Sequence, residues 1–519
     1  MSVSMSRRTL LSAAAGSVAA VAAVAAGAEA GAAPAGRTPI SPALRELEDK
    51  IRAGMQRYAI PGVAVGVWHR GTEYVRGFGV TNVDDPAPVD GDTVFRVAST
   101  TKTFTGTAAM RLVERGRLDL DRTVQSYLPG FHTTDPAASA RVTVRQLLNH
   151  SAGWLGDFFL DTGTDDDALA RYVEAMSRLP QLTPPGKVFS YNNAALSLAG
   201  RLIEVVTGSS YEEAVRTLVL DPLRLKHSAY FLDDIPGATV AVPHGVGADG
   251  KPFAAPEAFA MPRSIHPAGG LISSARDQVR WARFHLGDGR TPTGRRLLTR
   301  RSMHEMQSHP GPGGTLFVEL DGYGVTWMLR PTAEGPKVVQ HGGDWAGQHS
   351  GFLIVPERGF ALTVLTNSEG GPLLTAELFA DDWALRRFAG VRNLPAVSRS
   401  LPAGALAAYE GRYSGSQIGF EGETATVEID LVAAAGGLSV QVDGQEALRL
   451  EFYRRDYVRV LEPGGADTFF RANFVRGEDG KIAWLRYGGR LYRRGAATLR
   501  TAGRSLPLQR STLPYPGIR

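Results

Sequence analysis

The pattern of apolar and polar positions divides the chain into strand-like ends and a helical middle. Apolar residues recur at helical spacing over 40–58, and two alternating runs follow at 62–68 and 72–78. Helical spacing then dominates as far as residue 286, and strand-like runs return from residue 323. This order predicts an α+β domain in which one antiparallel sheet is assembled from both ends and helices pack on it.

The same pattern predicts the individual elements of this domain. The expected helices after the first one cover 106–117, 166–178, 193–207, 274–286 and 373–388, and a short helix that passes into a loop is expected within 144–153. The expected late strands cover 323–329, 337–341, 349–355 and 360–366. Gly208 follows the helix at 193–207 directly, which is a typical way for a helix to end.

A second domain is expected after a linker rich in Pro and Ser at 393–403, so that the first domain covers 38–392 and the second 404–500. Short alternating runs, separated by glycine-containing turns, lie at 424–431, 438–442, 448–452, 457–461, 469–474 and 482–487. Such a series predicts a small antiparallel β-barrel or sandwich. The last residues, 501–519, are expected to form a tail.

The amino terminus has the features of an export signal. Ser6, Arg7 and Arg8 resemble the twin-arginine motif, and an alanine-rich apolar run follows, with small residues suited to cleavage by residue 33. We expect residues 1–33 to direct the folded protein out of the cytoplasm, to the periplasm, the cell wall or the medium. No membrane span is expected after removal of the signal; the alternative is an uncleaved membrane anchor.

Composition excludes several kinds of chemistry. The sequence has no cysteine, so disulfides, thiolate zinc sites and cysteine nucleophiles are excluded. A formal charge of +5 is too small in 519 residues to indicate a nucleic-acid partner. No metal is expected, because His304 and His309 are one residue too far apart for a His-Glu-x-x-His site, and no nucleotide-binding loop indicates a cofactor.

The charge of the second domain is unevenly distributed along the sequence. Its first half is acidic and its second half is basic. Charge pairing between neighbouring strands explains this distribution best. The alternative is a surface that binds an anionic cell wall.

The candidate chemistry begins at Ser99 and Lys102. Only seven of the 57 basic residues are lysine, and Lys102 alone has a serine three positions before it. In a helix, residues three apart lie on the same face, so the hydroxyl and the amine can touch. A hydroxyl beside an uncharged amine is an activated nucleophile. The alternative for the two residues alone is a helix cap and a surface charge.

Three further segments contain side chains that fit this chemistry. Tyr191 and Asn193 precede a predicted helix as Tyr-x-Asn, and the segment His341-Gly342-Gly343-Asp344 follows a predicted strand. Residues 147–153, Leu-Leu-Asn-His-Ser-Ala-Gly, form the third segment, whose role the sequence does not define. No Gly-x-Ser-x-Gly motif is present, which disfavours an α/β-hydrolase.

Ser-x-x-Lys, Tyr-x-Asn and a basic residue before glycine, in this order, resemble the serine penicillin-recognising family. The resemblance covers roughly residues 40–390 and is greatest to class C β-lactamases, D,D-carboxypeptidases, D-aminopeptidases and related esterases. It implies a β-lactamase/transpeptidase-like fold. The second domain resembles the lipocalin-like barrel that some members append, although it carries no comparable motif.

The resemblance also implies a role for each catalytic residue. Ser99 would attack a carbonyl and form an acyl-enzyme, and Lys102, kept neutral by burial, would take its proton. Tyr191 would pass that proton to the leaving group and later help to activate water. Asn193 would hydrogen-bond both Lys102 and a substrate amide.

The third motif would form the other side of the site. The backbone N–H groups of Ser99 and Asp344 would make the oxyanion hole. His341, Gly342 and Gly343 would line the substrate edge.

One residue departs from the β-lactamase pattern. His341 stands where Lys-Thr-Gly is usual, and histidine is mostly neutral near pH 7. Substrates without a free carboxylate are therefore expected, most of all D-amino-acid peptides or amides. The alternatives are a carboxylesterase of the same family and a protein that binds penicillin or cell wall without turnover.

Overall fold

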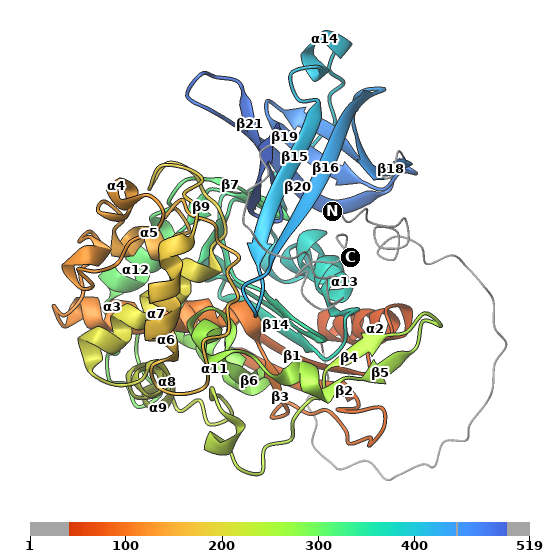
Figure 1. Ribbon diagram of the computed structural model, residues 1–519. Helices are drawn as coiled ribbons and strands as arrows, with labels where there is room; N and C mark the ends of the chain where they lie inside the picture. The colour runs from red at the N-terminus through yellow and green to blue at the C-terminus, as the bar shows by residue number, and fades with distance from the viewer. Residues whose placement is uncertain (1–40, 443–444, 496–519) are drawn as a thin grey trace.

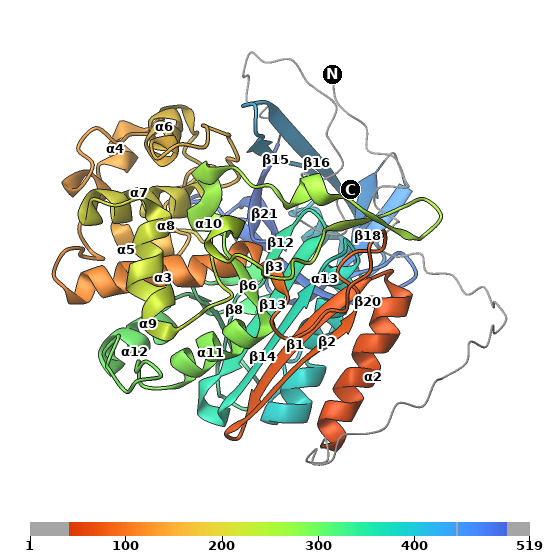
Figure 2. The same cartoon turned by 90° about the horizontal axis from the view of Figure 1, so that it is seen from below.

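The computed structural model describes residues 41–442 and 445–495. Its larger part is an antiparallel sheet with helices on both faces, and its smaller part is a closed β-barrel (Figures 1 and 2). The predicted fold class, an α+β domain followed by an antiparallel barrel, is confirmed. The predicted export signal and the predicted tail lie outside the described residues.

The sheet takes its strands from both ends of the first domain. β1 (Gly62–His69) and β2 (Thr72–Gly79) form a hairpin, and β1 pairs with β14 (Phe360–Thr366). The strand order is β2-β1-β14-β13-β11-β10-β9, and β12 pairs separately with β13. The other strands are β9 (Gly322–Tyr323), β10 (Met328–Arg330), β11 (Val338–Gln340), β12 (Gly343–Trp345) and β13 (Gln348–Val355).

Both faces of the sheet are buried, so its strands fill two cores. Val65 and Val364, which are register partners, point into a core shared with α2 (Pro42–Arg57) and α13 (Gly371–Thr375). Their neighbours Ala64 and Leu365 point into the opposite, larger core, because successive side chains of a strand alternate between faces. The larger core is covered by the helical middle of the chain (Figure 2).

α3 occupies the centre of the helical region. Every residue from Thr101 to Leu112 in this helix is buried, which allows its first turn to present side chains inside the protein. The longer helices here are α3 (Thr101–Glu114), α6 (Ala168–Ala175), α7 (Asn193–Thr207), α11 (Ala275–Leu286) and α12 (Arg300–Ser308), and the short helix α5 (Val144–Leu148) lies among them.

Shorter elements connect these parts. The short helices are α4 (Pro136–Ser139), α8 (Tyr211–Val215), α9 (Asp221–Leu223), α10 (His266–Gly269) and α14 (Ala403–Leu406). Three strand pairs lie beside the main sheet: β3 (Val94–Arg96) with β6 (Ile272–Ser274), β4 (His244–Val246) with β5 (Pro252–Ala254), and β7 (Gly314–Leu316) with β8 (Val318–Leu320).

Two predicted elements are wrong in detail. Residues 323–329 are not one strand, because the chain reverses between β9 and β10 at Thr326, whose φ is 63°. The amide of Thr326 donates to the Leu148 carbonyl at 2.9 Å, which holds this turn against α5. The helix predicted at 373–388 is interrupted at Asp382, where φ is 58°, so α13 is followed by separate turns.

The second domain is an eight-stranded barrel. Its strands are β15 (Gly411–Ile418), β16 (Thr424–Ala434), β17 (Gly437–Val442), β18 (Gln445–Arg454), β19 (Tyr457–Leu461), β20 (Asp467–Arg476), β21 (Ile482–Tyr487) and β22 (Arg490–Arg494). The sequence pattern did not predict β15 and β22, because these strands are rich in small polar or basic residues and lack a clear apolar alternation. These two strands pair with each other, Tyr413 opposite Arg494, and so close the barrel.

Backbone hydrogen bonds attach the barrel to the first domain. The amide of Phe159 donates to the Ile418 carbonyl at 2.8 Å, and the amide of Ile418 donates to the Asp157 carbonyl at 2.8 Å. At a second contact, the amide of Tyr191 donates to the Gly489 carbonyl at 2.9 Å. The lower ends of β15 and β16 accordingly reach the first domain in Figure 1.

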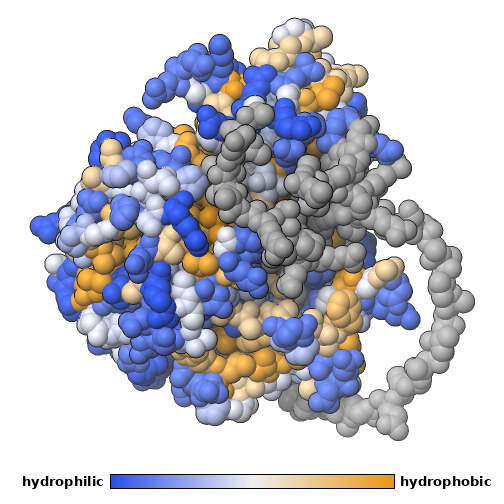
Figure 3. Space-filling model, in the orientation of Figure 1, coloured by the Kyte–Doolittle hydropathy of each residue, from blue (hydrophilic) through white to orange (hydrophobic). Residues whose placement is uncertain are grey.

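The surface carries its hydrophobic residues in separate patches. On the face drawn in Figure 3, hydrophilic residues cover most of the barrel and of the helical region. Among the described residues, no helix is both long enough and apolar enough to cross a membrane. Within the same residues, no group of three or more histidine or acidic side chains is placed to hold a metal ion.

Candidate active site

Ser99 lies where a buried strand turns into the central helix. The chain leaves β3, passes through the short turn Ala98–Thr100 and enters α3 at Thr101. Ala98 has a φ of 43°, a left-handed conformation that is uncommon for a residue with a side chain and costs energy. Ser99 lines a large cleft from this turn.

The amine of Lys102 is held by three oxygen atoms. Its Nζ lies 2.9 Å from Ser99 Oγ, 2.8 Å from Asn193 Oδ1 and 2.7 Å from the Ala268 carbonyl. The two carbonyl oxygens only accept hydrogen bonds. A neutral amine that donates its two N–H groups to them keeps its lone pair for the hydroxyl hydrogen of Ser99. The geometry therefore suits transfer of the serine proton to the lysine.

Burial favours this neutral state. The Lys102 side chain is fully buried, and loss of hydration lowers the pKa of its ammonium group well below the usual value. The positive charge of Arg490 lowers this pKa further, whereas the carboxylate of Asp157 opposes the shift.

Tyr191 and Asn193 enter the site from the start of α7. Asn192 caps this helix by accepting from the amide of Ala195 at 2.8 Å, which fixes the two flanking side chains. The Lys102 Nζ lies 4.9 Å from the centre of the Tyr191 ring. Tyr191 and Asn193 are both buried and both line the cleft beside Ser99.

The third motif runs along the opposite side of the nucleophile. His341 is fully buried, and loss of hydration, followed by the charge of Lys102, lowers its pKa to about 3, so its ring is neutral at pH 7. A Cβ on Gly343 would lie 2.5 Å from the Ser99 amide nitrogen, so only glycine permits this approach. The motif therefore packs β12 directly against the turn that carries Ser99.

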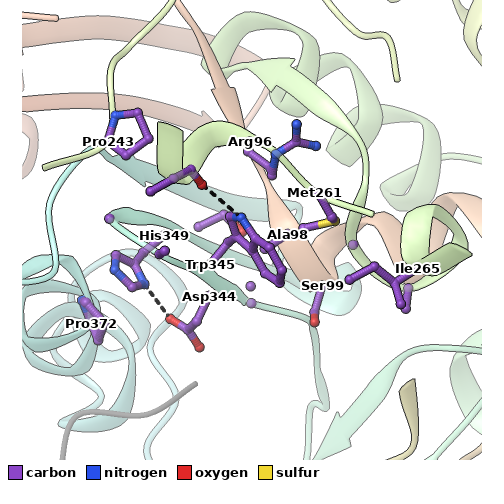
Figure 4. Close-up of a pocket in the computed structure, with 18 of the residues that line it drawn as sticks. Arg96, Ala98, Ser99, Pro243, Met261, Ile265, Asp344, Trp345, His349 and Pro372 are labelled. Atoms are coloured by element: carbon purple, nitrogen blue, oxygen red, sulfur yellow. Dashed lines mark hydrogen bonds and ion pairs between the residues drawn. The ribbon is translucent and has the colours of Figure 1, made fainter. Parts of the chain in front are cut away.

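Asp344 projects into the cleft beside Ser99 and is held by a histidine (Figure 4). Its Oδ1 lies 2.8 Å from Nδ1 of His349, its register partner on β13. The next residue, Trp345, donates its indole N–H to the carbonyls of Ala258 at 3.0 Å and Ala260 at 3.1 Å. These bonds tie β12 to the segment that covers the cleft.

The cleft itself has a volume of about 1290 Å³ and is mostly lined by apolar side chains. Phe253 at its edge is 53% exposed and Phe231 is 39% exposed, values that are high for large apolar side chains. The aromatic residues around it include Phe159, Phe231, Phe253, Phe259, Trp345 and Phe420.

Comparisons with known proteins agree with this arrangement of residues. The model of the family described as Beta-lactamase matches residues 47–384, which is most of the chain. The chain belongs to the β-lactamase family. Its membership supports a serine hydrolase of this type in general, without defining the substrate.

Several relatives of the β-lactamase family resemble this chain in sequence. Penicillin-binding protein 4 of Amycolatopsis lactamdurans is 35% identical over 348 residues, which cover 66% of this chain and 90% of the relative. Protein flp of Staphylococcus aureus strain MW2 is 24% identical over 360 residues, which cover 67% of this chain and 68% of the relative.

Solved structures extend the similarity into the barrel. SurE is 28% identical with a TM-score of 0.67, and the match covers 87% of this chain and 99% of SurE. A structure of SurE with D-Leu gives 27% identity and a TM-score of 0.65 over the same shares of the two chains. An octameric penicillin-binding protein homologue from Pyrococcus abyssi shares the fold, with 24% identity, a TM-score of 0.58 and coverage of 82% and 99%.

Six of the eight predicted site residues of this β-lactamase-family chain line one cleft, Lys102 and His341 are buried next to them, and three further residues lie close by. Sequence reasoning did not single out Asp157 or Arg490, which are brought in by a loop and by the barrel. His150 lies in the segment 147–153, and its ring stacks on Tyr191 with centroids 4.5 Å apart. The Leu-Leu-Asn-His-Ser-Ala-Gly phrase was the only sequence signal for any of the three.

Proposed function

We propose that this chain is an exported serine hydrolase that works through an acyl-enzyme on Ser99 and acts on D-amino-acid peptides or amides. The observation that carries the proposal is the set of contacts of Lys102. The oxygens of Asn193 and Ala268, at 2.8 and 2.7 Å from Nζ, can accept both N–H groups of a neutral amine, which leaves its lone pair for the Ser99 hydroxyl at 2.9 Å. This arrangement gives the serine a base without any histidine.

The proposed reaction has two halves. In the first, Ser99 Oγ bonds to the substrate carbonyl carbon and its proton moves to Lys102. Lys102 returns this proton through the phenol of Tyr191 to the leaving group, as the bond between the carbonyl carbon and the leaving group breaks. The N–H groups of Ser99 and Asp344 stabilise the oxyanion, at typically about 3 kcal/mol for each donor. In the second half, water attacks the acyl carbon, one proton of the water passes through the same groups to Ser99 Oγ, and the bond from the acyl carbon to Oγ breaks to release the acid.

Four features support the choice of substrate. His341 is neutral and supplies no cation for a free carboxylate. The carboxylate of Asp344 in the cleft repels a free carboxylate on the substrate. The exposed rings of Phe231 and Phe253 suit an apolar side chain at the edge of the cleft. SurE, a relative across most of the chain, has been crystallised with D-Leu.

A carboxylesterase is the second candidate, because the neutral His341 favours uncharged esters equally. Penicillin binding without turnover is the third, since the relative from Amycolatopsis lactamdurans has a penicillin-binding name and is 35% identical. Export rests on the twin-arginine pattern at residues 6–8 and places the activity in the periplasm, at the cell wall or in the medium.

A substrate panel on the purified full chain tests the proposal. D-Ala-p-nitroanilide and its L-isomer are compared with p-nitrophenyl acetate, with Ser99→Ala as the control for each. We expect turnover of the D-anilide, little of the L-anilide, and none by Ser99→Ala. Turnover of the acetate alone would support the esterase, and a stable adduct without product would support the non-turnover protein. Activity retained by Ser99→Ala would overturn the assignment of the nucleophile.

A further inference from the structure

The last hairpin of the barrel enters the active site of the first domain. β21 and β22 are joined by Gly488 and Gly489, and the carbonyl of Gly489 accepts from the amide of Tyr191 at 2.9 Å. Gly489 has a φ of 78°, and a Cβ there would lie 3.2 Å from the Cβ of Tyr191. The barrel therefore lies against the segment that carries a proposed catalytic residue.

This hairpin places Arg490 inside the site. Its guanidinium pairs with Asp157 through two bonds, Nε to Oδ2 at 2.9 Å and Nη2 to Oδ1 at 3.1 Å. A third nitrogen, Nη1, donates to the Gly488 carbonyl at 2.9 Å, and the group lies 4.6 Å from the centre of the Tyr191 ring. Both partners of the ion pair are largely buried, with side-chain exposures of 15% and 8%. Bidentate pairs of this kind are geometrically specific.

Asp157 connects the pair to the catalytic lysine. Its Oδ1 accepts from Asn193 Nδ2 at 2.8 Å, and Asn193 Oδ1 in turn accepts from Lys102 Nζ at 2.8 Å. A carboxylate only accepts, so it orients the Asn193 amide with its oxygen towards the lysine. The chain of contacts thus runs from the barrel to the base.

We propose that Arg490 is a positioning residue of the catalytic centre, which acts on Lys102 through Asp157 and Asn193 and makes the barrel part of the active site. This inference rests on the proposed function of Ser99 and Lys102. Without Arg490, Asp157 is a buried carboxylate close to the amine and holds it in the charged state. With Arg490, the carboxylate is neutralised and still orients Asn193.

The sign of each effect follows from charge. The groups that face the Lys102 amine are Asp157, Arg490, His150, His341 and the Tyr191 phenol. Burial lowers the pKa of both histidines, so they are neutral at pH 7. Acylation needs neutral lysine, and its rate therefore rises with pH through the pKa of Lys102. Removal of the Arg490 cation raises that pKa, whereas removal of the Asp157 anion lowers it.

The test is the pH profile of covalent labelling of the full chain by an alkyl fluorophosphonate. In this reaction Ser99 Oγ bonds to phosphorus, fluoride leaves and the serine proton passes to the lysine. The rate of labelling, plotted against pH, has its inflection at the pKa of Lys102. We expect Arg490→Ala to raise the pH of this inflection and Asp157→Asn to lower it, each by about one pH unit or more. Arg490→Lys keeps the charge, so its inflection stays closer to that of the parent.

The matched control is Arg493→Ala, an exposed residue on the same strand, which leaves the profile unchanged. The inference would be overturned if the pH of the inflection stayed the same in Asp157→Asn and Arg490→Ala, or if it changed in the same direction in both. Asp157→Asn preserves the shape of the side chain and decides the question alone if Arg490→Ala does not fold. Labelling that persists in Ser99→Ala would instead reject the proposed function, so the two failures are distinct.

Discussion

The imidazole of His150 is stacked on the phenol ring of Tyr191, with ring centroids 4.5 Å apart and planes 24° from parallel. Nδ1 of the same imidazole accepts from the amide of Asn192 at 2.9 Å, which fixes the ring in place. Burial, followed by the charges of Lys102, His341 and Arg490, lowers the pKa of His150 well below its usual value. His150 therefore acts as a neutral support for Tyr191.

Replacement of His150 by alanine tests this support. His150→Ala removes both the stacked ring and the acceptor for Asn192, so Tyr191 loses its position, and we expect turnover to fall by about 100-fold. The measurement is kcat and KM on the best substrate of the panel. His150→Phe restores a ring and should recover part of kcat. Equal losses in the two variants would contradict a stacking role.

The residue at position 341 is expected to set the response to carboxylates. His341→Lys introduces a cation at the substrate edge, and a charged hydrogen bond to a penicillin carboxylate should raise the rate of labelling by fluorescent penicillin about tenfold. The readout is the ratio of this rate to the rate with an uncharged fluorophosphonate. His304→Lys, on the exposed face of α12, is the control. An unchanged ratio in His341→Lys would contradict the account.

Gly343 is expected to be indispensable for acylation. A Cβ at this position would lie 2.2 Å from the Val97 carbonyl and 2.5 Å from the Ser99 amide nitrogen, both of them backbone atoms. Gly343→Ala should therefore move β12 away from the nucleophile and slow fluorophosphonate labelling by about 100-fold. Gly130→Ala, where no atom lies within 4 Å of the added carbon, should match the parent. Normal labelling of Gly343→Ala would show that this approach is not needed.

Stability is expected to fall in acid because several buried histidines, four of them fully desolvated or nearly so, are neutral. Loss of hydration lowers the pKa of His150, His266, His285 and His341 in the folded state. Below about pH 6.5 the unfolded chain binds protons that the folded chain does not. The free energy of unfolding therefore decreases from pH 7 to pH 5, by up to about 1.4 kcal/mol per pH unit for each histidine.

The contribution of one histidine is measurable by urea unfolding at several pH values. His285, whose burial lowers its pKa to about 3, lies away from the cleft, so His285→Gln isolates this effect from catalysis. We expect the variant to lose less stability than the parent between pH 7 and pH 5. The same dependence on pH in both proteins would refute the assignment.

The fold was largely predictable because hydrophobic periodicity is a local signal. The helix at 193–207 and the strands at 349–355 and 360–366 agree with the structure within about one residue at each end. The turn at Thr326 was not predictable because it requires a positive φ in a β-branched residue, and the break at Asp382 was not predictable because one aspartate inside a helical pattern does not indicate a positive φ. Tertiary contacts impose both.

The site was predictable to the extent that its residues occur in short motifs. Ser99, Lys102, Tyr191, Asn193 and the segment 341–344 come together around the cleft, as their order in the sequence suggested. The role of Arg490 in the site was not predictable, because this residue lies about 300 residues from Tyr191, in a run of basic residues that is typical of an exposed surface strand. The position of the Arg490 side chain depends on how the barrel closes and on how it packs against the first domain.

The central claim is that Ser99 forms an acyl-enzyme with Lys102 as its base. Intact-mass spectrometry after brief exposure of the full chain to an alkyl fluorophosphonate, an uncharged reagent that bonds to the nucleophile that would carry the acyl group, followed by peptide mapping, tests it most directly. The account predicts one adduct, on the peptide that contains Ser99, which is absent in Ser99→Ala and much slower to form in Lys102→Ala. An adduct on another residue, or one that forms equally fast in Lys102→Ala, would contradict it.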